Sequence, residues 1–114
     1  NHVVKHGNLD SVRTYSHIDD AIEAYWLCSE SDKYGEVYNI GGNETCKVGD
    51  ALDSMIKKSD KPFVKVLDEE RLRPTDITLQ IPSTDKFKSH FDWKPKKTMD
   101  DIWNDLLEYW RNIV

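Results

Sequence analysis

Residues 13–30 read RTYSHIDDAIEAYWLCSE and carry a strong helix signal. Over residues 19–30 apolar side chains recur at three- and four-residue spacing, which places Ile22, Tyr25 and Trp26 on one face. Two aspartates stand in the first turn, where the helix dipole favours negative charge. The stretch therefore predicts an amphipathic helix whose aromatic side is buried in the core.

Shorter elements flank this helix on both sides in the sequence. Alternation of apolar and polar residues predicts strands at residues 3–5, 36–40, 63–67 and 77–81. Helical spacing predicts further helices at residues 48–58, 84–90 and 98–112. Because long connections separate the strands, the pattern favours some parallel pairing and predicts a mixed α/β fold.

The last helix combines a capped start with an apolar face. Thr98 and Asp101 fit a capping box in which Asp replaces the usual Glu. We expect the helix to bury a face made of Ile102, Leu106, Tyr109, Trp110 and Ile113. Trp103 lies seven residues before Trp110, so we interpret both as packing residues rather than as a platform for a nucleobase.

Composition excludes several classes of protein. The 114 residues carry 16 basic and 21 acidic side chains, and the net charge of −5 argues against a nucleic-acid-binding surface. No stretch reaches the ~18 apolar residues of a membrane span. Cys28 and Cys46 fit neither a disulfide scaffold nor a zinc site, so we expect two reduced, buried thiols and a cytoplasmic protein. Because the chain begins with Asn rather than Met, we expect residues 1–114 to be a single fragment of a longer protein.

Catalytic and metal-binding motifs are incomplete. The sequence holds no glycine-rich phosphate loop, no nucleophile elbow and no His-Glu-x-x-His pair. The four histidines are scattered, so we assign none of them to catalysis or to a metal. This fragment therefore has no predicted catalytic residue and no predicted metal site.

Two arginines are the strongest candidates for ligand binding. Arg13 precedes the first helix, and Arg73 lies in the charged loop at 68–76, stiffened by Pro74. A guanidinium group presents a planar fork of donors that fits phosphate, and two of them from different loops can clamp a diphosphate. Asp76 can accept hydrogen bonds from sugar hydroxyls. The alternative is that both arginines make ordinary surface ion pairs.

Asn43 is a further candidate because it follows the Gly41-Gly42 turn at the end of a predicted strand. In that position its side chain can contact a bound ligand. The alternative is that Gly41-Gly42-Asn43 simply ends the strand.

Four stretches of the sequence carry short motifs that occur together in one enzyme family. Residues 13–21 resemble the helix start R-D-[WF]-x-[YH]-V-x-D-x-[AV], and residues 37–42 resemble the strand and turn Y-N-I-G. Residues 73–76 are similar to the loop R-P-x-[DE], and residues 85–95 to the segment D-x-[ST]-K…G-W-x-P. Each motif is short, but the four occur in the order found in the extended short-chain dehydrogenase/reductase family, the nucleotide-sugar epimerases and dehydratases, which this chain therefore resembles.

Within this family, residues 7–13 (GNLDSVR) are most similar to the GDP-mannose 4,6-dehydratases, which have G-N-L-D-x-x-R. The resemblance implies the C-terminal portion of such an enzyme: the edge of a Rossmann sheet plus a small mixed α/β substrate-binding domain. It implies NADP or NAD as cofactor, bound mainly by an N-terminal Rossmann domain that these residues do not contain. The substrate-binding residues implied for this portion are Asn8, Arg13, Asn43, Arg73 and Asp76.

The resemblance also implies an enzyme that removes water from a nucleotide sugar, with this fragment alone inactive. We expect a homo-oligomer that binds a nucleotide sugar and neither nucleic acid nor a membrane. Thr14 replaces the usual Asp, and Phe91-Asp92 stands where Leu-Gly is common, which leaves the base and the reaction open. The alternatives are another epimerase, dehydratase or reductase acting on a UDP- or dTDP-sugar, and a non-catalytic acidic binding module.

Overall fold

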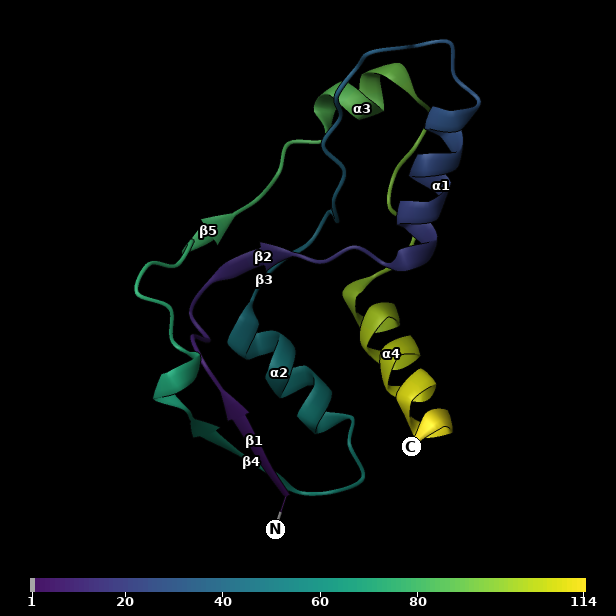
Figure 1. Cartoon of the computed structure of the whole chain (residues 1–114). Coiled ribbons are helices and arrows are strands. Elements are labelled where there is room, and N and C mark those ends of the chain that lie inside the picture. Colours follow the sequence, from purple (N-terminus) through teal and green to yellow (C-terminus); the bar gives the residue numbers. More distant parts are fainter. Residues whose placement is uncertain (1) are drawn as a thin grey trace.

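The computed structural model describes residues 2–114, which contain both helices and strands along the whole chain (Figure 1). In chain order the elements are β1 (His2–His6), β2 (Val12–Thr14), α1 (Ile18–Ser29), β3 (Thr45–Lys47), α2 (Val48–Lys57), β4 (Phe63–Leu67), a 3₁₀ turn (Glu69–Arg71), β5 (Leu79–Gln80), α3 (Asp85–His90) and α4 (Met99–Ile113). The predicted mixed α/β class is confirmed.

The strands form two small sheets. In the first, β1 and β4 run parallel, with His2 opposite Phe63 and His6 opposite Leu67. In the second, β2 is the central strand, antiparallel to β3 and parallel to β5. The expected parallel pairing is therefore present in both sheets, and α2 lies on the connection between β1 and β4 (Figure 1).

Side chains that cap their own backbone set the starts of α1 and α4. The predicted capping box is present: Thr98 Oγ1 accepts from the Asp101 amide at 3.1 Å, and Asp101 Oδ2 accepts from the Thr98 amide at 2.9 Å. The bond from the Thr98 amide lowers the pKa of Asp101. At α1 the cap is His17, whose Nδ1 accepts from the Asp19 amide at 3.0 Å.

A cluster of buried aromatic side chains joins α1, α3 and the turn after α3. Its buried members are Ala24, Phe87 and Trp93, and Leu27, Tyr38, Ile40 and Phe91 pack against them. The ring of Trp93 meets Phe87 edge-on with 5.2 Å between centroids. Trp93 Nε1 donates to the backbone oxygen of Asp20 at 3.1 Å, so burial of the indole leaves its polar group satisfied.

Asp20 adds a second bond between α1 and the residues after α3. Its carboxylate is buried, and its two oxygens accept from the backbone amides of Lys96 at 3.0 Å and Lys97 at 3.1 Å. A buried carboxylate is tolerated only where hydrogen bonds replace its water. Asp20 therefore contributes to tertiary packing as well as to the dipole at the start of α1.

The prediction that the aromatic face of α1 is buried in this chain is wrong. Ile22, Tyr25 and Trp26 are 57, 72 and 62% exposed. The helix turns Asp20 and Ala24 toward the aromatic cluster instead, so the predicted face points outward. Periodicity identifies an apolar face, but it does not identify what covers that face.

The predicted face of α4 needs a similar correction. Trp103 is buried, with its ring 5.1 Å from that of Tyr15, and Leu107 is half-buried. The residues expected to be buried are largely outside: Leu106, Tyr109, Trp110 and Ile113 are exposed, and only Ile102 is half-buried. The side of α4 that packs against the rest of the chain therefore lies beside the side that the sequence predicts to be buried.

The strand predicted at residues 36–40 is absent, since no strand of residues 2–114 pairs with this segment. Tyr38 and Ile40 still alternate inward and pack against the aromatic cluster, while Val37 is exposed. The predicted alternation of inward and outward side chains is present, but a strand also needs a hydrogen-bonded neighbour. The strand predicted at 77–81 is present only as the two-residue β5.

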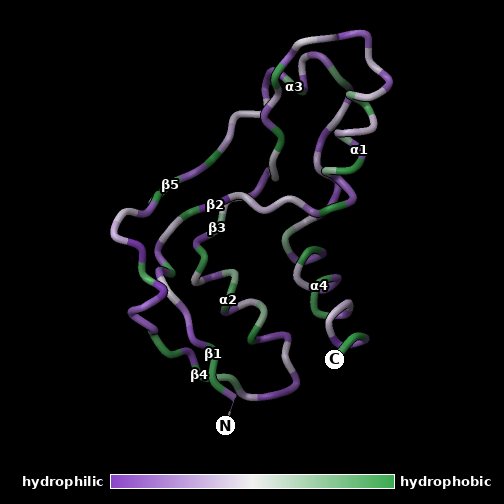
Figure 2. The backbone as a smooth tube through the Cα atoms, viewed as in Figure 1, coloured by the Kyte–Doolittle hydropathy of each residue, from purple (hydrophilic) through white to green (hydrophobic). Residues whose placement is uncertain are grey.

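Hydrophobic residues are spread along all the longer helices rather than gathered at one centre (Figure 2). Within the described part of the chain, no helix has the length and apolar character needed to cross a membrane. Neither Cys28 nor Cys46 forms a disulfide within residues 2–114, but the prediction that both are buried is wrong, since Cys28 is exposed and Cys46 is half-buried.

Candidate functional site

Arg13 lies on β2, the central strand of the second sheet, where it is paired with Cys46 on β3 and Gln80 on β5. Its guanidinium group donates to the backbone oxygens of Val12, at 2.9 Å, and Ile77. A guanidinium group has five N–H donors, so these bonds orient Arg13 and leave donors for a ligand.

Asp76 lies beside this guanidinium group. Its Oδ1 is 3.7 Å from a terminal nitrogen of Arg13 and accepts from the Ile77 amide at 2.9 Å. Its Oδ2 accepts from the Asn8 amide group at 2.9 Å. The bond from Asn8 is the main reason that the pKa of Asp76 is lowered, and the Ile77 amide and the charges of Arg13 and Arg73 act in the same direction. Asp76 is therefore ionised at neutral pH.

Arg73 lies exposed in the loop that leads to Asp76. Its positive charge acts on the Asp76 carboxylate together with that of Arg13. The effect of the Arg73 charge on the pKa of Asp76 is smaller than that of the bond from Asn8.

The two asparagines differ in their surroundings. Asn8 lies in the loop after β1 and joins the network of Arg13 and Asp76. Asn43 does not contact this network: its Oδ1 accepts from Lys88 Nζ of α3 at 3.1 Å. The structure thus brings Asn8, Arg13 and Asp76 together and gives Asn43 a different neighbour.

Gly7 allows the loop after β1 and the loop after β4 to approach each other closely. A Cβ at this position would lie 2.7 Å from the backbone oxygen of Arg71, nearer than Cβ atoms come in proteins. The absence of a side chain at Gly7 therefore lets the Asn8 segment pack against the segment that carries Arg73.

A cavity of about 470 Å³ opens beside Arg13. Its lining includes Thr14, Asn39, Gln80 and Pro82, and it is more polar than apolar. This volume falls in the range of small-molecule sites. Sequence reasoning missed Asn39 and Gln80, because their proximity to Arg13 depends on the β2–β5 register and on the path of a segment without strand pairing.

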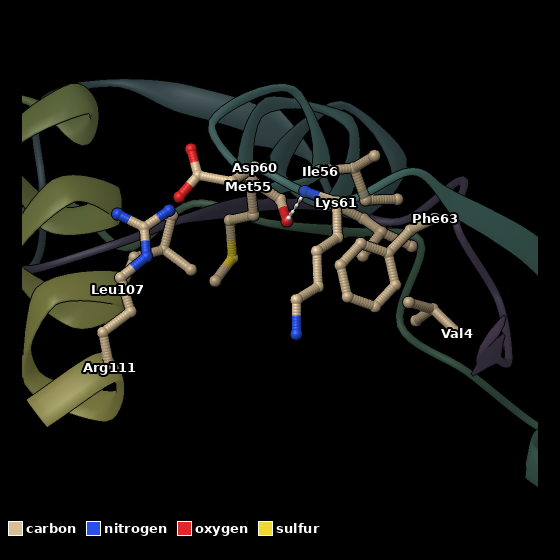
Figure 3. A pocket seen from close by; sticks show the side chains of 10 residues that line it. Val4, Met55, Ile56, Asp60, Lys61, Phe63, Leu107 and Arg111 are labelled. Atoms are coloured by element: carbon tan, nitrogen blue, oxygen red, sulfur yellow. Dashed lines mark hydrogen bonds between the residues drawn. The ribbon is translucent and has the colours of Figure 1, made fainter. Parts of the chain in front are cut away.

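A second cavity of about 470 Å³ lies between α2, α4 and the first sheet (Figure 3). Met55 and Phe63 line it, with Leu107 and Arg111 of α4 on the facing side (Figure 3). Arg111 donates to the backbone oxygen of Lys58 at 2.9 Å. The lining is mostly apolar, so this cavity offers less to an anionic ligand than the cavity at Arg13.

His17 is a buried histidine at the start of α1. Its Nε2 contacts Asp105 Oδ2 at 2.7 Å, and its Nδ1 is taken by the Asp19 amide. Both ring nitrogens are occupied, so His17 has no free nitrogen to act as a base in this arrangement. Within the described residues no three His, Cys, Asp or Glu side chains gather as a metal site.

Comparison with known proteins places these residues in a family. The model of the GDP-mannose 4,6 dehydratase family matches residues 1–106. The GDP-mannose 4,6 dehydratase of Drosophila melanogaster is 26% identical over 90% of this chain, and that of Homo sapiens is 27% identical over 89%. The dTDP-glucose 4,6-dehydratase of Escherichia coli is 25% identical over 92%. The chain spans about a third of the length of these relatives, 30 to 32%.

Solved structures share the same fold. The UDP-glucuronic acid 4-epimerase of Bacillus cereus, in complex with UDP-glucuronic acid and NAD, matches 98% of this chain with a TM-score of 0.84 at 23% identity. The RMD protein of Pseudomonas aeruginosa, complexed with NADPH, matches 98% with a TM-score of 0.81 at 18% identity. The chain covers 35 and 37% of these two structures, so it has the fold of part of a Rossmann-type short-chain dehydrogenase/reductase. Given the family model that matches nearly all of its residues, the chain belongs to the GDP-mannose 4,6 dehydratase family, within the nucleotide-sugar dehydratases and epimerases.

Proposed function

We propose that this chain is the C-terminal, nucleotide-sugar-binding portion of an NAD(P)-dependent dehydratase whose substrate is GDP-mannose. Arg13 and Arg73 hold the diphosphate. The observation that carries the proposal is the position of Arg13, which lines a polar cavity and lies 3.7 Å from the carboxylate of Asp76, three residues after Arg73. Two guanidinium forks from separate loops match the several anionic oxygens of a diphosphate.

Asp76 accepts a hydrogen bond from a ribose hydroxyl or from the edge of the base. Its Oδ1 takes one short bond, from the Ile77 amide, and lies 3.7 Å from Arg13, so it has room for a further donor. The side chain of Asn43 accepts a hydrogen bond from Lys88, so Asn43 contacts the ligand only if the ligand replaces Lys88 as its partner.

The hydride chemistry belongs to NADP or NAD, held mainly by an N-terminal Rossmann domain of the parent enzyme. A Tyr-x-x-x-Lys pair, which the resemblance implies for that chemistry, does not occur in these residues. Residues 1–114 therefore bind and orient the substrate and are inactive alone. The free thiols of Cys28 and Cys46 support a reducing, cytoplasmic location for a parent that forms homo-oligomers.

Two experiments test the proposal. The parent enzyme, incubated with GDP-mannose and NADP, should form the 4-keto-6-deoxy sugar nucleotide. In calorimetry with GDP, Arg13→Ala and Arg73→Ala should each weaken binding about 10- to 100-fold, the loss expected for a hydrogen bond to a charged group. Arg111→Ala, at the apolar cavity, is the matched control and should leave GDP binding unchanged. Equal binding by all three variants would contradict the clamp.

The second candidate is the same role in an enzyme that acts on a UDP- or dTDP-sugar. It is favoured by the dTDP-glucose 4,6-dehydratase relatives, whose identity is close to that of the GDP-mannose enzymes. Turnover of UDP-glucose or dTDP-glucose by the parent, with no product from GDP-mannose, would select this candidate.

A further inference from the structure

Ser11 is among the few buried polar side chains of the chain, 3% exposed. It lies in a closed triangle with Asn8 and Asp76. The amide nitrogen of Asn8 donates to Ser11 Oγ at 3.0 Å and to Asp76 Oδ2 at 2.9 Å, and Ser11 Oγ donates to the same carboxylate oxygen at 3.4 Å. We call Asn8, Ser11 and Asp76 the carboxylate triangle.

The backbone around Ser11 is fixed on both sides. The Val12 amide donates to the Thr78 oxygen at 2.8 Å, which ties this segment to the residues before β5. On the other side, the Val48 amide donates to the Ser11 oxygen at 2.9 Å, which ties it to the start of α2. Asn8 and Ser11 therefore form a rigid base to which the Asp76 carboxylate is attached.

The other oxygen of this carboxylate faces Arg13. Asp76 Oδ1 lies 3.7 Å from a terminal nitrogen of Arg13, and the same nitrogen donates to the Ile77 oxygen. The direction of the Arg13 fork therefore depends on where Asp76 and Ile77 are held. Asp76 is in turn held by groups from the loop after β1.

We propose that Asn8 and Ser11 are positioning residues: they hold the carboxylate of Asp76 so that the Arg13 fork faces the polar cavity in the geometry that a diphosphate requires. This inference rests on the proposed diphosphate clamp. It assigns to Asn8 an indirect role, through Asp76, and adds Ser11, which no sequence motif singled out.

The test uses Asn8→Ala and Ser11→Ala in the complete chain. Two matched controls carry the same substitutions at surface bonds: Asn104→Ala, whose amide donates to Asp100, and Ser54→Ala, whose hydroxyl donates to the Asp50 oxygen. We expect GDP affinity to fall about 2- to 10-fold in each of the first two variants, the loss typical of one hydrogen bond, and to stay unchanged in the controls.

Two NMR readouts are independent of the nucleotide. The carboxyl carbon of Asp76 should titrate at a higher pH in Asn8→Ala than in the unchanged chain, because that variant loses the bond that lowers the pKa of Asp76, and the Nε–H signal of Arg13 should move in both variants. A purely structural role would lower stability without moving either signal while the chain stays folded. If Ser11→Ala unfolds the chain, Asn8→Asp decides the matter, because it keeps the shape and places a second negative charge against Asp76.

The outcomes separate the two proposals. Unchanged NMR signals in Asn8→Ala and Asn8→Asp would overturn the positioning role whether or not GDP binds. GDP binding by the unchanged chain with no loss in the variants would also overturn it. If neither the chain nor its parent binds GDP, UDP or dTDP, the diphosphate clamp fails, and the positioning role toward that ligand fails with it. Shifted NMR signals would then show that Asn8 and Ser11 orient Asp76 and Arg13, but not for a diphosphate.

Discussion

His17 Nε2 lies 2.7 Å from Asp105 Oδ2, and this contact joins the start of α1 to the middle of α4. Because the Nδ1 of the same ring accepts from the Asp19 amide, the proton resides on Nε2 and is donated to Asp105. The buried ring of His17 therefore caps α1 and also binds α4 through Asp105.

Asp105→Ala should lower the free energy of unfolding by about 0.5–1.5 kcal/mol, because it removes the partner of a buried N–H group. Denaturant unfolding measures the change. Glu108→Ala, an exposed acidic position on the same helix, is the control and should have almost no effect. Equal stability of the two variants would show that the contact between His17 and Asp105 contributes nothing.

Asp20→Asn should destabilise the chain by about 1–3 kcal/mol although it preserves size and shape. An amide offers one acceptor oxygen, whereas the carboxylate serves the backbone amides of both Lys96 and Lys97. One buried N–H group is then left without a partner. The exposed Asp92→Asn is the matched control in the same unfolding experiment. A loss no larger than that of the control would contradict this role.

Asp76→Asn should lower stability at neutral pH, and its difference from the unchanged chain should disappear in acid. The pKa of Asp76 is lowered in the folded chain, first by the bond from Asn8, below the ordinary value of 3.8. The ionised carboxylate therefore stabilises the fold fully above the unfolded pKa, and this stability is lost as the pH falls through the folded pKa. Unfolding curves between pH 7 and pH 2 measure the trend. A difference that stays constant over this range would argue against it.

The isolated chain should self-associate at micromolar to millimolar concentration, because exposed apolar surface and unpaired strand edges favour it. Tyr25 and Trp26 on α1 and Trp110 on α4 are all more than half exposed. Trp26→Lys should reduce association in light scattering or sedimentation. Tyr34→Lys, at an aromatic residue 86% exposed in a turn, is the control. A monomer at millimolar concentration in the unchanged chain would contradict the prediction.

The parts of the fold that sequence could predict depend on neighbours along the chain. The capping box joins Thr98 to Asp101, three residues later, so the local sequence alone is enough to predict it. The alternation at 36–40 was equally visible, yet it forms no strand, since pairing depends on a second segment. The outward aromatic face of α1 follows the same rule, because a helix face is buried only by what packs on it.

The candidate site was predictable in its residue types and not in its connections. Arg13, Arg73 and Asp76 were found from the chemistry of phosphate and from family motifs. The hydrogen bond from Asn8 to Asp76 joins residues 68 positions apart, and no local sequence pattern predicts it. Asn43 shows the converse: a plausible turn residue whose side chain contacts α3 instead.

The contact at Gly7 has a consequence for how this region tolerates change. The spacing between the loop after β1 and the loop after β4 is set by contact between their main chains, where Gly7 faces the backbone oxygen of Arg71. Substitutions of the side chains that line the cavity at Arg13 can therefore change which molecule fits there, while the spacing of these two loops stays the same. Adding a single methyl group at Gly7 would instead push apart the segment that carries Asn8 and the segment that carries Arg73.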